Sequence, residues 1–542
     1  MRLEDIPTTT QYLIVGGGTG GLVVACRLSE DPDNYIVVLE SGPDASEDGR
    51  IRDPLLWRSW SGSELDWKLK IAPQTGFNGR EVDHPAGKVL GGSSAINGLV
   101  FTPPSPAGID AWAKLGNPDW NWETLRPYLQ KSYTLNGPKS TQSSSLGEQA
   151  HGPIQVTFPT LADIKSSPLA QAWKDALNSL GYEHSVDVLG EKRTIGTRDY
   201  TATIDSTSGL RSSADNAYGQ VAAKRANISI IPEASVRRIL FSSGSERTTA
   251  TGVEFSYQGK TARIQATREV ILAAGAFHTP KILELSGIGS QERLSRLGIP
   301  VIIDQPGVGE NLQNHVMSML PVPLKAHPDI EGMSLGFKGV AYTRIGQDDQ
   351  GQLFAHMEPA SLSDKVIQSI ISQPDEASAI LMILVIPGGK VVLGVITSFP
   401  FSRGTCHITS SNPDEMPSID MGFFSNDLDI EFLARHVESL HQLTTTQALE
   451  PFLQPSMALD LEAIKQLLRE STAGSCHHAC GTVGMLPREA GGVVDQELKV
   501  YGTKNLRVVD ASVFPLITHA NPIATVYAVA ERAADIIRGR EW

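Results

Sequence analysis

Residues that could perform acid–base chemistry lie close together near the C-terminal end of the chain. The segment 475–482 reads Ser-Cys-His-His-Ala-Cys-Gly-Thr, and Asn521 stands before a proline further along. A histidine such as His477 or His478 titrates near neutral pH and can accept a proton from a substrate. An amide such as that of Asn521 can hold a substrate oxygen by donating a hydrogen bond.

These side chains also have structural interpretations. By its spacing alone, His478 is best interpreted as a buried, hydrogen-bonded core histidine. Asn521 could cap a helix that has Pro522 in its first turn. Cys476, Cys480 and the two histidines could bind zinc, but structural zinc sites join ligand pairs across a loop. No second cysteine pair occurs in the chain, so we predict no metal site.

A glycine-rich loop near the N-terminus predicts a dinucleotide-binding unit. A strand is expected over 12–15, a helix over about 22–28, and a second strand over 35–39 that ends at Glu40. The glycines permit a tight turn beside a pyrophosphate, and the acid can accept hydrogen bonds from a ribose. The loop residues expected to bind the nucleotide are Gly16, Gly18, Thr19, Gly20 and Gly21. The loop does not distinguish NAD from FAD.

The rest of the chain predicts two kinds of sheet. Buried strands are expected at 269–274 and 506–509, and they could join the first two in one sheet assembled from distant segments. Residues 312–467 contain short apolar or alternating runs punctuated by Pro and Gly. That pattern predicts an inserted α+β domain with an antiparallel sheet. The stretch from about 430 to 468 is expected to be largely helical.

Composition limits the possible functions. The 542 residues are enough for two or more domains. A net charge of −14 disfavours nucleic-acid binding, which needs clustered basic residues. The apolar run 379–386 is far shorter than the roughly 18 residues of a membrane helix, so no membrane span is expected. Four cysteines and no leader pattern indicate a cytoplasmic, intracellular protein.

Several further segments resemble the signatures of the glucose–methanol–choline (GMC) oxidoreductases, and the resemblance covers nearly the whole chain. Segment 87–98, Gly-Lys-Val-Leu-Gly-Gly-Ser-Ser-Ala-Ile-Asn-Gly, resembles the first signature. Segment 275–289, which begins Gly-Ala-Phe-His-Thr-Pro, resembles the second. Segments 306–313, 402–404 and 506–512 are also typical of the family.

The resemblance implies the fold of that family. This is an α/β FAD-binding Rossmann-like domain with an interleaved α+β substrate-binding domain built on an antiparallel sheet. The FAD-binding domain would comprise 1–157, 207–311 and 468–542, and the substrate-binding domain 158–206 and 312–467. Besides the glycine loop and Glu40, the residues implied to bind FAD are Gly91, Gly92, Ser93, Asn97, Val236, Ala274, Gly275, Asp510 and Ala511.

The resemblance also assigns catalytic roles. The family pattern His-x-x-Gly-Thr is satisfied by residues 478–482, so His478 rather than His477 is the expected base. Asn521 stands where the family carries Asn or His. The alcohol would lose its hydroxyl proton to His478 and a hydride to flavin N5, while Asn521 positions the oxygen. The substrate pocket is expected to include Phe101, Phe399, Phe401 and His519.

Departures from the family pattern surround the expected site. Ile96 stands where some members attach flavin covalently through a histidine, so non-covalent FAD is expected. Ala86 replaces a frequent arginine. The substrate is therefore inferred only broadly, as a primary or secondary alcohol of aryl, allylic or natural-product-like type, in secondary metabolism. Oxygen and other electron acceptors stay open, as does the oligomeric state. A hydroxynitrile-lyase-like, non-redox enzyme on the same scaffold is the alternative.

Overall fold

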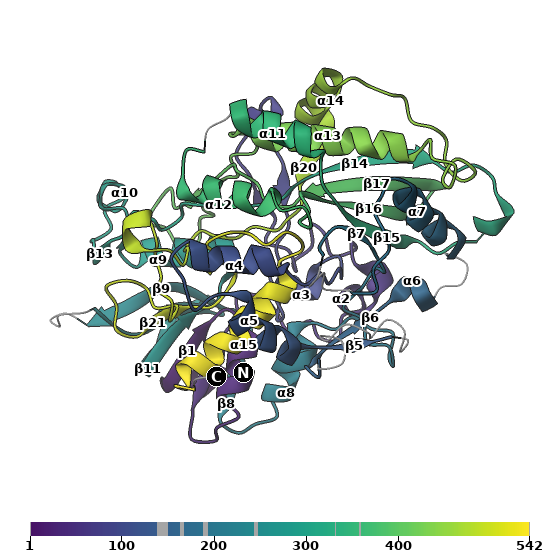
Figure 1. Ribbon diagram of the computed structural model, residues 1–542. Helices are drawn as coiled ribbons and strands as arrows, with labels where there is room; N and C mark the ends of the chain where they lie inside the picture. The colour runs from purple at the N-terminus through teal and green to yellow at the C-terminus, as the bar shows by residue number, and fades with distance from the viewer. Residues whose placement is uncertain are drawn as a thin grey trace.

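Two large β-sheets organise the chain, and helices pack against both (Figure 1). The computed structural model describes residues 2–137, 150–162, 167–187, 193–242, 248–330, 332–356 and 359–540. Within these ranges, no helix is long and apolar enough to cross a membrane.

The first sheet has seven strands in the order β8-β2-β1-β11-β10-β9, and β21 also pairs with β11. Its strands are β1 (Thr9–Val15), β2 (Ile36–Leu39), β8 (Ile228–Ile231), β9 (Ala234–Ser242), β10 (Thr249–Tyr257), β11 (Lys260–Leu272) and β21 (Leu506–Val508). The strands β8, β2, β1, β11 and β21 pair in parallel. The prediction that distant strands join one sheet is therefore confirmed. Their carboxyl ends share one edge, where open α/β sheets bind ligands.

The dinucleotide loop connects β1 to helix α1 (Thr19–Leu28) at that edge. Gly16 has a φ of 105°, and a Cβ there would lie 2.4 Å from the carbonyl oxygen of Ala273. A Cβ on Gly20 would lie 2.2 Å from the carbonyl oxygen of Val509. Because both distances are far below van der Waals contact, only glycine lets α1 and its loop pack so closely on β11 and β21.

The second sheet has six antiparallel strands in the order β20-β14-β17-β16-β15-β7. Its strands are β7 (Gly196–Arg198), β14 (Val316–Pro323), β15 (Gly336–Thr343), β16 (Ala379–Ile386), β17 (Lys390–Thr397) and β20 (Ala473–Ser475). The predicted antiparallel sheet within 312–467 is thus confirmed. Residues 387–389 form the turn between β16 and β17, which explains the Pro-Gly-Gly that ends the apolar run.

One face of this second sheet is covered by helices α13 (Asp427–Leu443) and α7 (Ser167–Ser179) (Figure 1). Successive side chains of a strand point to opposite faces. Leu381 of β16 and Leu393 of β17 therefore share a face, and they lie in one buried cluster with Leu433 of α13. The opposite face of these strands contributes nothing to that cluster.

The stretch from about 430 to 468, expected to be largely helical, contains two helices. Helix α13 ends at Leu443, and α14 (Leu461–Leu467) follows after a non-helical connection. The side chain of Asn426 caps α13 by accepting the N–H of Leu428.

Other helices are α2 (Gly49–Arg52), α3 (Ser93–Ile96), α4 (Pro106–Lys114), α5 (Trp122–Ser132), α6 (Pro159–Ala162), α8 (Gln220–Ala222), α9 (Gly275–Leu285), α10 (Gln291–Arg296), α11 (Gln347–His356), α12 (Leu362–Ile371) and α15 (Ile523–Ile537). Small two-stranded sheets are formed by β3 (Leu69–Lys70) with β4 (Asp83–His84), β5 (Tyr133–Asn136) with β6 (Ile154–Thr157), β12 (Ile288–Gly289) with β13 (Ile303–Asp304), and β18 (Thr405–His407) with β19 (Ser418–Asp420).

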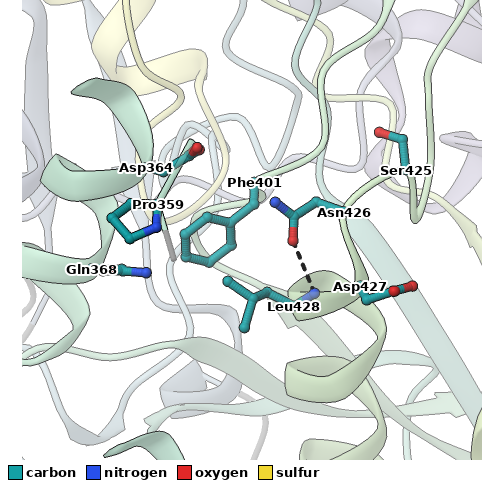
Figure 2. A pocket seen from close by; sticks show the side chains of 8 residues that line it. All are labelled: Pro359, Asp364, Gln368, Phe401, Ser425, Asn426, Asp427 and Leu428. Carbon is teal, nitrogen blue, oxygen red and sulfur yellow. Dashed lines mark hydrogen bonds between the residues drawn. The ribbon is translucent and has the colours of Figure 1, made fainter. Parts of the chain in front are cut away.

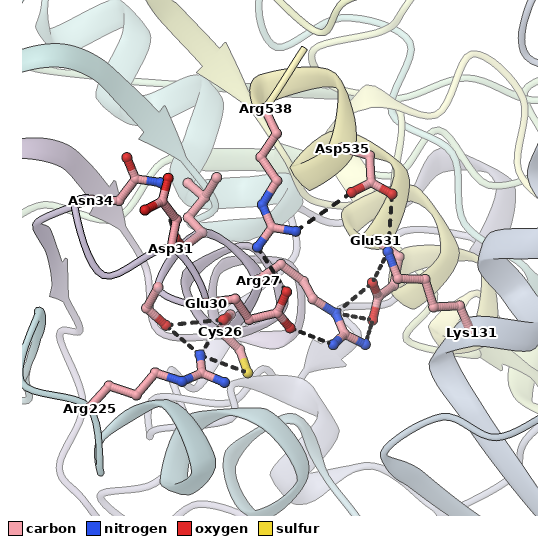
Figure 3. Close-up of polar contacts among 12 residues, drawn as sticks. Cys26, Arg27, Glu30, Asp31, Asn34, Lys131, Arg225, Glu531, Asp535 and Arg538 are labelled. Atoms are coloured by element: carbon pink, nitrogen blue, oxygen red, sulfur yellow. Dashed lines mark hydrogen bonds and ion pairs between the residues drawn. The ribbon is translucent and has the colours of Figure 1, made fainter. Parts of the chain in front are cut away.

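A buried ion network joins the first and last helices of the chain (Figure 3). The carboxylate of Glu531 in α15 is fully buried and lies 2.7 Å from the guanidinium of Arg27 in α1. Lys131 of α5 lies 3.3 Å from the same carboxylate, and the Tyr218 hydroxyl donates to it at 2.9 Å. Because a buried carboxylate needs such partners, these contacts specify how α15 docks against α1 and α5.

One strand of the second sheet bears on the domain ranges proposed from the sequence. The range 468–542, which we assign to the FAD-binding domain, includes β20. That strand pairs with β14 of the second sheet. The exact domain boundaries therefore stay a proposal.

Candidate active site

His478 lies at the centre of a buried chain of hydrogen bonds. Its Nδ1 is 2.8 Å from Nδ1 of His315, and its Nε2 is 3.0 Å from Nδ2 of Asn521. Nε2 of His315 is in turn 2.9 Å from the carbonyl oxygen of Ser398. The backbone N–H of His478 donates to the side-chain oxygen of Asn314 at 2.8 Å. The second sheet and the start of α15 thus position one imidazole together.

The contacts assign the hydrogen positions on both rings. The carbonyl of Ser398 can only accept, so Nε2 of His315 carries a hydrogen. Nδ1 of the neutral His315 ring then accepts the Nδ1–H of His478. Nε2 of His478 therefore carries no hydrogen, and its lone pair accepts a hydrogen bond from the amide of Asn521. This tautomer is the one that a proton-accepting Nε2 requires.

Burial also keeps these rings uncharged. It lowers the pKa of His478 well below its usual value, and the neighbouring His315 acts in the same direction. Burial lowers the pKa of His315 to about 4. Both imidazoles are therefore neutral at neutral pH, and His478 can accept a proton.

Asn521 does not act as the cap of α15. The residue at the cap position of that helix is Pro522, and no side chain caps it. The amide of Asn521 reaches His478 instead, so the capping interpretation of this residue is wrong.

The other residues of the Cys–His segment have separate surroundings. Sγ of Cys476 is 3.7 Å from Nε2 of His478. His477 has a φ of 63°, and its ring lies 5.1 Å from that of His84. Cys480 is buried. Among the described residues, no group of three or more His, Cys, Asp or Glu side chains could hold a metal ion.

The glycine loop faces the first signature segment across a gap too narrow for side chains. Helix α1 begins after Gly18, and no side chain caps it. A Cβ on Gly92 would lie 2.8 Å from Cα of Gly18, and the N–H of Gly91 donates to the carbonyl of Gly17. The free N–H groups at the start of α1 can bind phosphate oxygens at this junction. The cradle therefore fits the pyrophosphate of FAD.

Glu40 braces the glycine loop. It is buried at the end of β2, where its carboxylate accepts the N–H of Gly17 at 2.8 Å and that of Gly42 at 2.7 Å. Burial raises the pKa of Glu40 to about 7, although both hydrogen bonds oppose that shift. The predicted contact of Glu40 with a ribose stays a prediction.

Four of the predicted FAD-binding residues lie together at the carboxyl ends of β11 and β21. Ala274 and Gly275 follow β11, while Asp510 and Ala511 follow β21. The carboxylate of Asp510 accepts the N–H of Gly275 at 2.9 Å. The N–H of Gly481 donates to the carbonyl of Ala511, which ties the His478 segment to this edge.

The remaining predicted FAD-binding residues lie in two places, at the two ends of α3 and on β9. Asn97 accepts a hydrogen bond from the buried Arg211 at 2.8 Å. Burial lowers the pKa of this guanidinium to about 10, and the sequence offered no signal for its role. Ser93 accepts the N–H of Gly87 at 3.3 Å. Val236 is half-buried on the edge strand β9.

Two of the predicted pocket residues are packed in the interior. Phe101 is buried, with its ring 5.0 Å from that of Tyr133. His519 is also buried, and its Nδ1 accepts the N–H of Ser105 at 2.9 Å. Burial lowers the pKa of His519 to about 3, so this ring is neutral.

The other two lie near helices α4, α12 and α13. Phe399 lies against Gly108 of α4. Phe401 borders a cavity of about 340 Å³, shown in Figure 2. The residues lining this cavity are Pro359, Asp364, Gln368, Phe401, Ser425, Asn426, Asp427 and Leu428. Neither His478 nor Asn521 is among them.

The sequence-based assignment missed His315 and Asn314. Both directly follow the family-like segment 306–313 and precede β14. A histidine between a glycine-rich turn and an apolar strand is the signal that could have identified the first. Its contact with His478 could not have been inferred, because the two residues are far apart in the sequence.

A glycine-lined dinucleotide cradle and a buried neutral histidine beside an amide are features of a dinucleotide-dependent oxidoreductase. Comparison with known proteins supports this class. The N-terminal GMC oxidoreductase family model matches residues 10–317, and the C-terminal one matches residues 400–530. The chain belongs to the GMC oxidoreductase family, and its fold is the FAD-binding Rossmann-like domain with an interleaved substrate-binding domain.

Individual relatives match over almost the full length. A GMC oxidoreductase family protein of Malassezia sympodialis, Mala s 12, is 33% identical over 97% of this chain and 92% of its own. An FAD-dependent oxidoreductase from Chaetomium thermophilum superposes with a TM-score of 0.88 at 28% identity, covering 98% of this chain and 99% of that one. A fungal aryl-alcohol oxidase gives a TM-score of 0.85 at 27% identity, with 98% and 99% covered.

Proposed function

We propose that this protein oxidises a primary or secondary alcohol and that Nε2 of His478 takes the hydroxyl proton. The single observation that carries the proposal is the buried chain Ser398–His315–His478–Asn521, which leaves the Nε2 lone pair facing an amide donor. FAD, when bound, supplies an acceptor for the hydride that leaves the substrate carbon. We expect it to be held without a covalent bond, because Ile96 cannot form one.

Asn521, His478 and His315 have different roles in the proton transfer. The amide of Asn521 donates to the substrate oxygen and holds it near Nε2 of His478. When that nitrogen gains the proton, the ring becomes an imidazolium whose Nδ1–H still donates to His315. His315 cannot turn away, because its own Nε2–H is held by the carbonyl of Ser398. The base is thus oriented before the substrate arrives, which lowers the cost of reaching the transition state.

The proposal is tested by anaerobic reduction of the bound flavin with alcohols. We expect His478→Ala to retain the yellow cofactor and to lose reduction by a factor of about 100 or more, because a positioned base contributes roughly 10²–10⁴-fold. His477→Asn is the matched control, since asparagine tolerates the left-handed backbone at that position. Wild-type reduction by His478→Ala would refute the assignment of the base.

The same experiment separates the alternatives. If no alcohol reduces the flavin but the protein cleaves a cyanohydrin, the scaffold serves a hydroxynitrile-lyase-like reaction without redox. If reduction occurs, reoxidation by air and by a quinone identifies an oxidase or a dehydrogenase.

A further inference from the structure

In the described part of the chain, the buried charge of Arg211 has no carboxylate as a partner. Arg211 is 2% exposed, and its Nε donates to the carbonyl oxygen of Ile51 at 2.9 Å. Its Nη1 donates to Oδ1 of Asn97 at 2.8 Å and to the carbonyl oxygen of Ser94 at 3.4 Å. Burying a charge without an opposite charge is costly, which points to a role beyond packing.

The contact with Arg211 fixes the orientation of the Asn97 amide. Oδ1 of Asn97 accepts Nη1–H of Arg211 at 2.8 Å and the N–H of Leu99 at 3.0 Å. Both partners can only donate, so the amide oxygen faces them and Nδ2 points the other way. Within the described ranges, no group accepts the two hydrogens of Nδ2, and this nitrogen is not buried. The amide can therefore donate to a ligand.

Asn97 lies on the stretch of chain that runs from the pyrophosphate cradle towards the candidate catalytic residues. It directly follows α3, and a Cβ on Gly92 at the start of this helix would lie 2.8 Å from a backbone atom of the glycine loop. The helix separates Asn97 from that contact by about 7 Å, because five residues rise roughly 1.5 Å each. Further along the chain, the N–H of Ser105 donates to His519, two residues before Asn521. A dinucleotide with its pyrophosphate at the glycine loop and its flavin ring beside the alcohol would follow the same path.

We propose that Arg211 is a positioning residue that holds the Asn97 amide with its N–H groups turned to the flavin ring, and that this donor favours the reduced flavin. The inference rests on the proposed function, since it takes FAD as the cofactor. A hydride carries two electrons from the substrate carbon, so the ring that accepts it gains negative charge. An N–H donor stabilises this charge, and the cation behind the amide strengthens the donor by polarising it. A carboxylate beside Arg211 would weaken that polarisation.

Asn97→Asp separates this role from a purely structural one. The carboxylate keeps an acceptor for Arg211 and Leu99 and gives Arg211 a counter-ion, but it replaces the N–H donor with a second oxygen. We expect reduced flavin to bind at least about tenfold more weakly relative to oxidised flavin, which lowers the two-electron reduction potential by about 30 mV or more. A contact that only supports the fold would leave the potential unchanged. Asn178→Asp, at an exposed position of α7, makes the same change of charge and should not alter the potential.

Variants of Arg211 test the other half of the pair. Arg211→Met removes the charge and the donors at similar length, whereas Arg211→Lys keeps the charge. We expect Arg211→Met to lower the reduction potential and Arg211→Lys to recover part of the loss. Flavin content and the thermal transition report whether each variant is folded. If Arg211→Met does not fold, Asn97→Asp still decides.

The potential is measured anaerobically in the holoenzyme, by chemical reduction in the presence of a reference dye. No alcohol is needed, so a failure of every alcohol to reduce the flavin would defeat the proposed function and leave this test intact. An unchanged potential in folded, flavin-loaded Asn97→Asp would overturn the inference. Equal weakening of oxidised and reduced flavin would also overturn it, because the amide would then bind the pyrophosphate and not the ring.

Discussion

Replacing His315 with phenylalanine tests whether that residue orients the catalytic histidine. The substitution keeps an aromatic ring of similar size but removes the acceptor 2.8 Å from Nδ1 of His478 and the donor 2.9 Å from the carbonyl of Ser398. The Nδ1–H of His478 then has no partner in a buried setting. His315→Phe should therefore destabilise the transition state for proton transfer, in which His478 becomes charged.

The size of the rate loss follows from the hydrogen bond between His478 and His315 when His478 is protonated. A hydrogen bond to a charged group contributes about 1.5–3 kcal/mol, and each 1.36 kcal/mol corresponds to a tenfold change in rate. We therefore expect flavin reduction by a given alcohol to slow by roughly 10–150-fold in His315→Phe. His315→Asn is the control that supplies a carbonyl acceptor near the lost Nδ1, and it should recover part of the rate.

The assay is anaerobic stopped-flow reduction of the flavin as a function of pH. Because His478 accepts a proton only in its neutral form, the rate should fall on the acidic side of the profile, and the plateau above that limb should be lower in His315→Phe than in the wild type. Flavin content and the thermal transition report whether the variant is folded. An unchanged plateau in folded, flavin-loaded His315→Phe would refute the orienting role.

Three further predictions concern the scaffold. Glu531→Gln should reduce the free energy of unfolding by about 1.5–3 kcal/mol in urea titrations, because Arg27 and Lys131 lose a buried carboxylate although they keep Glu30 and Asp535 as partners. Burial alone would lower the pKa of His407, but hydrogen bonds to two glutamates outweigh burial and raise it. Its stabilising effect is therefore full below about pH 6.5 and is lost as pH rises through the folded-state pKa, so His407→Gln should be most destabilising in mildly acidic urea titrations. Gly20→Ala should abolish flavin retention, measured by absorbance after gel filtration, because its Cβ would lie 2.2 Å from the Val509 carbonyl, whereas Gly49→Ala, which meets no atom within 4 Å, should retain it.

The glycine loop and the β-α-β unit around it were predictable from short stretches of sequence. The loop was predictable because the backbone packs closely around it. Gly16 and Gly20 must be glycine, since carbonyl oxygens lie where a Cβ would be. The same local logic applies to the apolar run 379–386, which is β16 in the structure, because the Pro-Gly-Gly that follows it marks a turn. His478 was chosen over His477 through the family pattern alone.

Tertiary structure decided the contacts that make His478 useful. Its pairing with His315 depends on β20 lying beside β14, and the hydrogen on its Nδ1 depends on the carbonyl of Ser398 at the end of β17. No short pattern encodes that register, since antiparallel pairing of distant strands is settled by packing of the whole sheet. The apolar runs indicated that these strands are buried. Only the fold shows which alternate residues face α13 and which, like Met319, face the opposite side of the sheet.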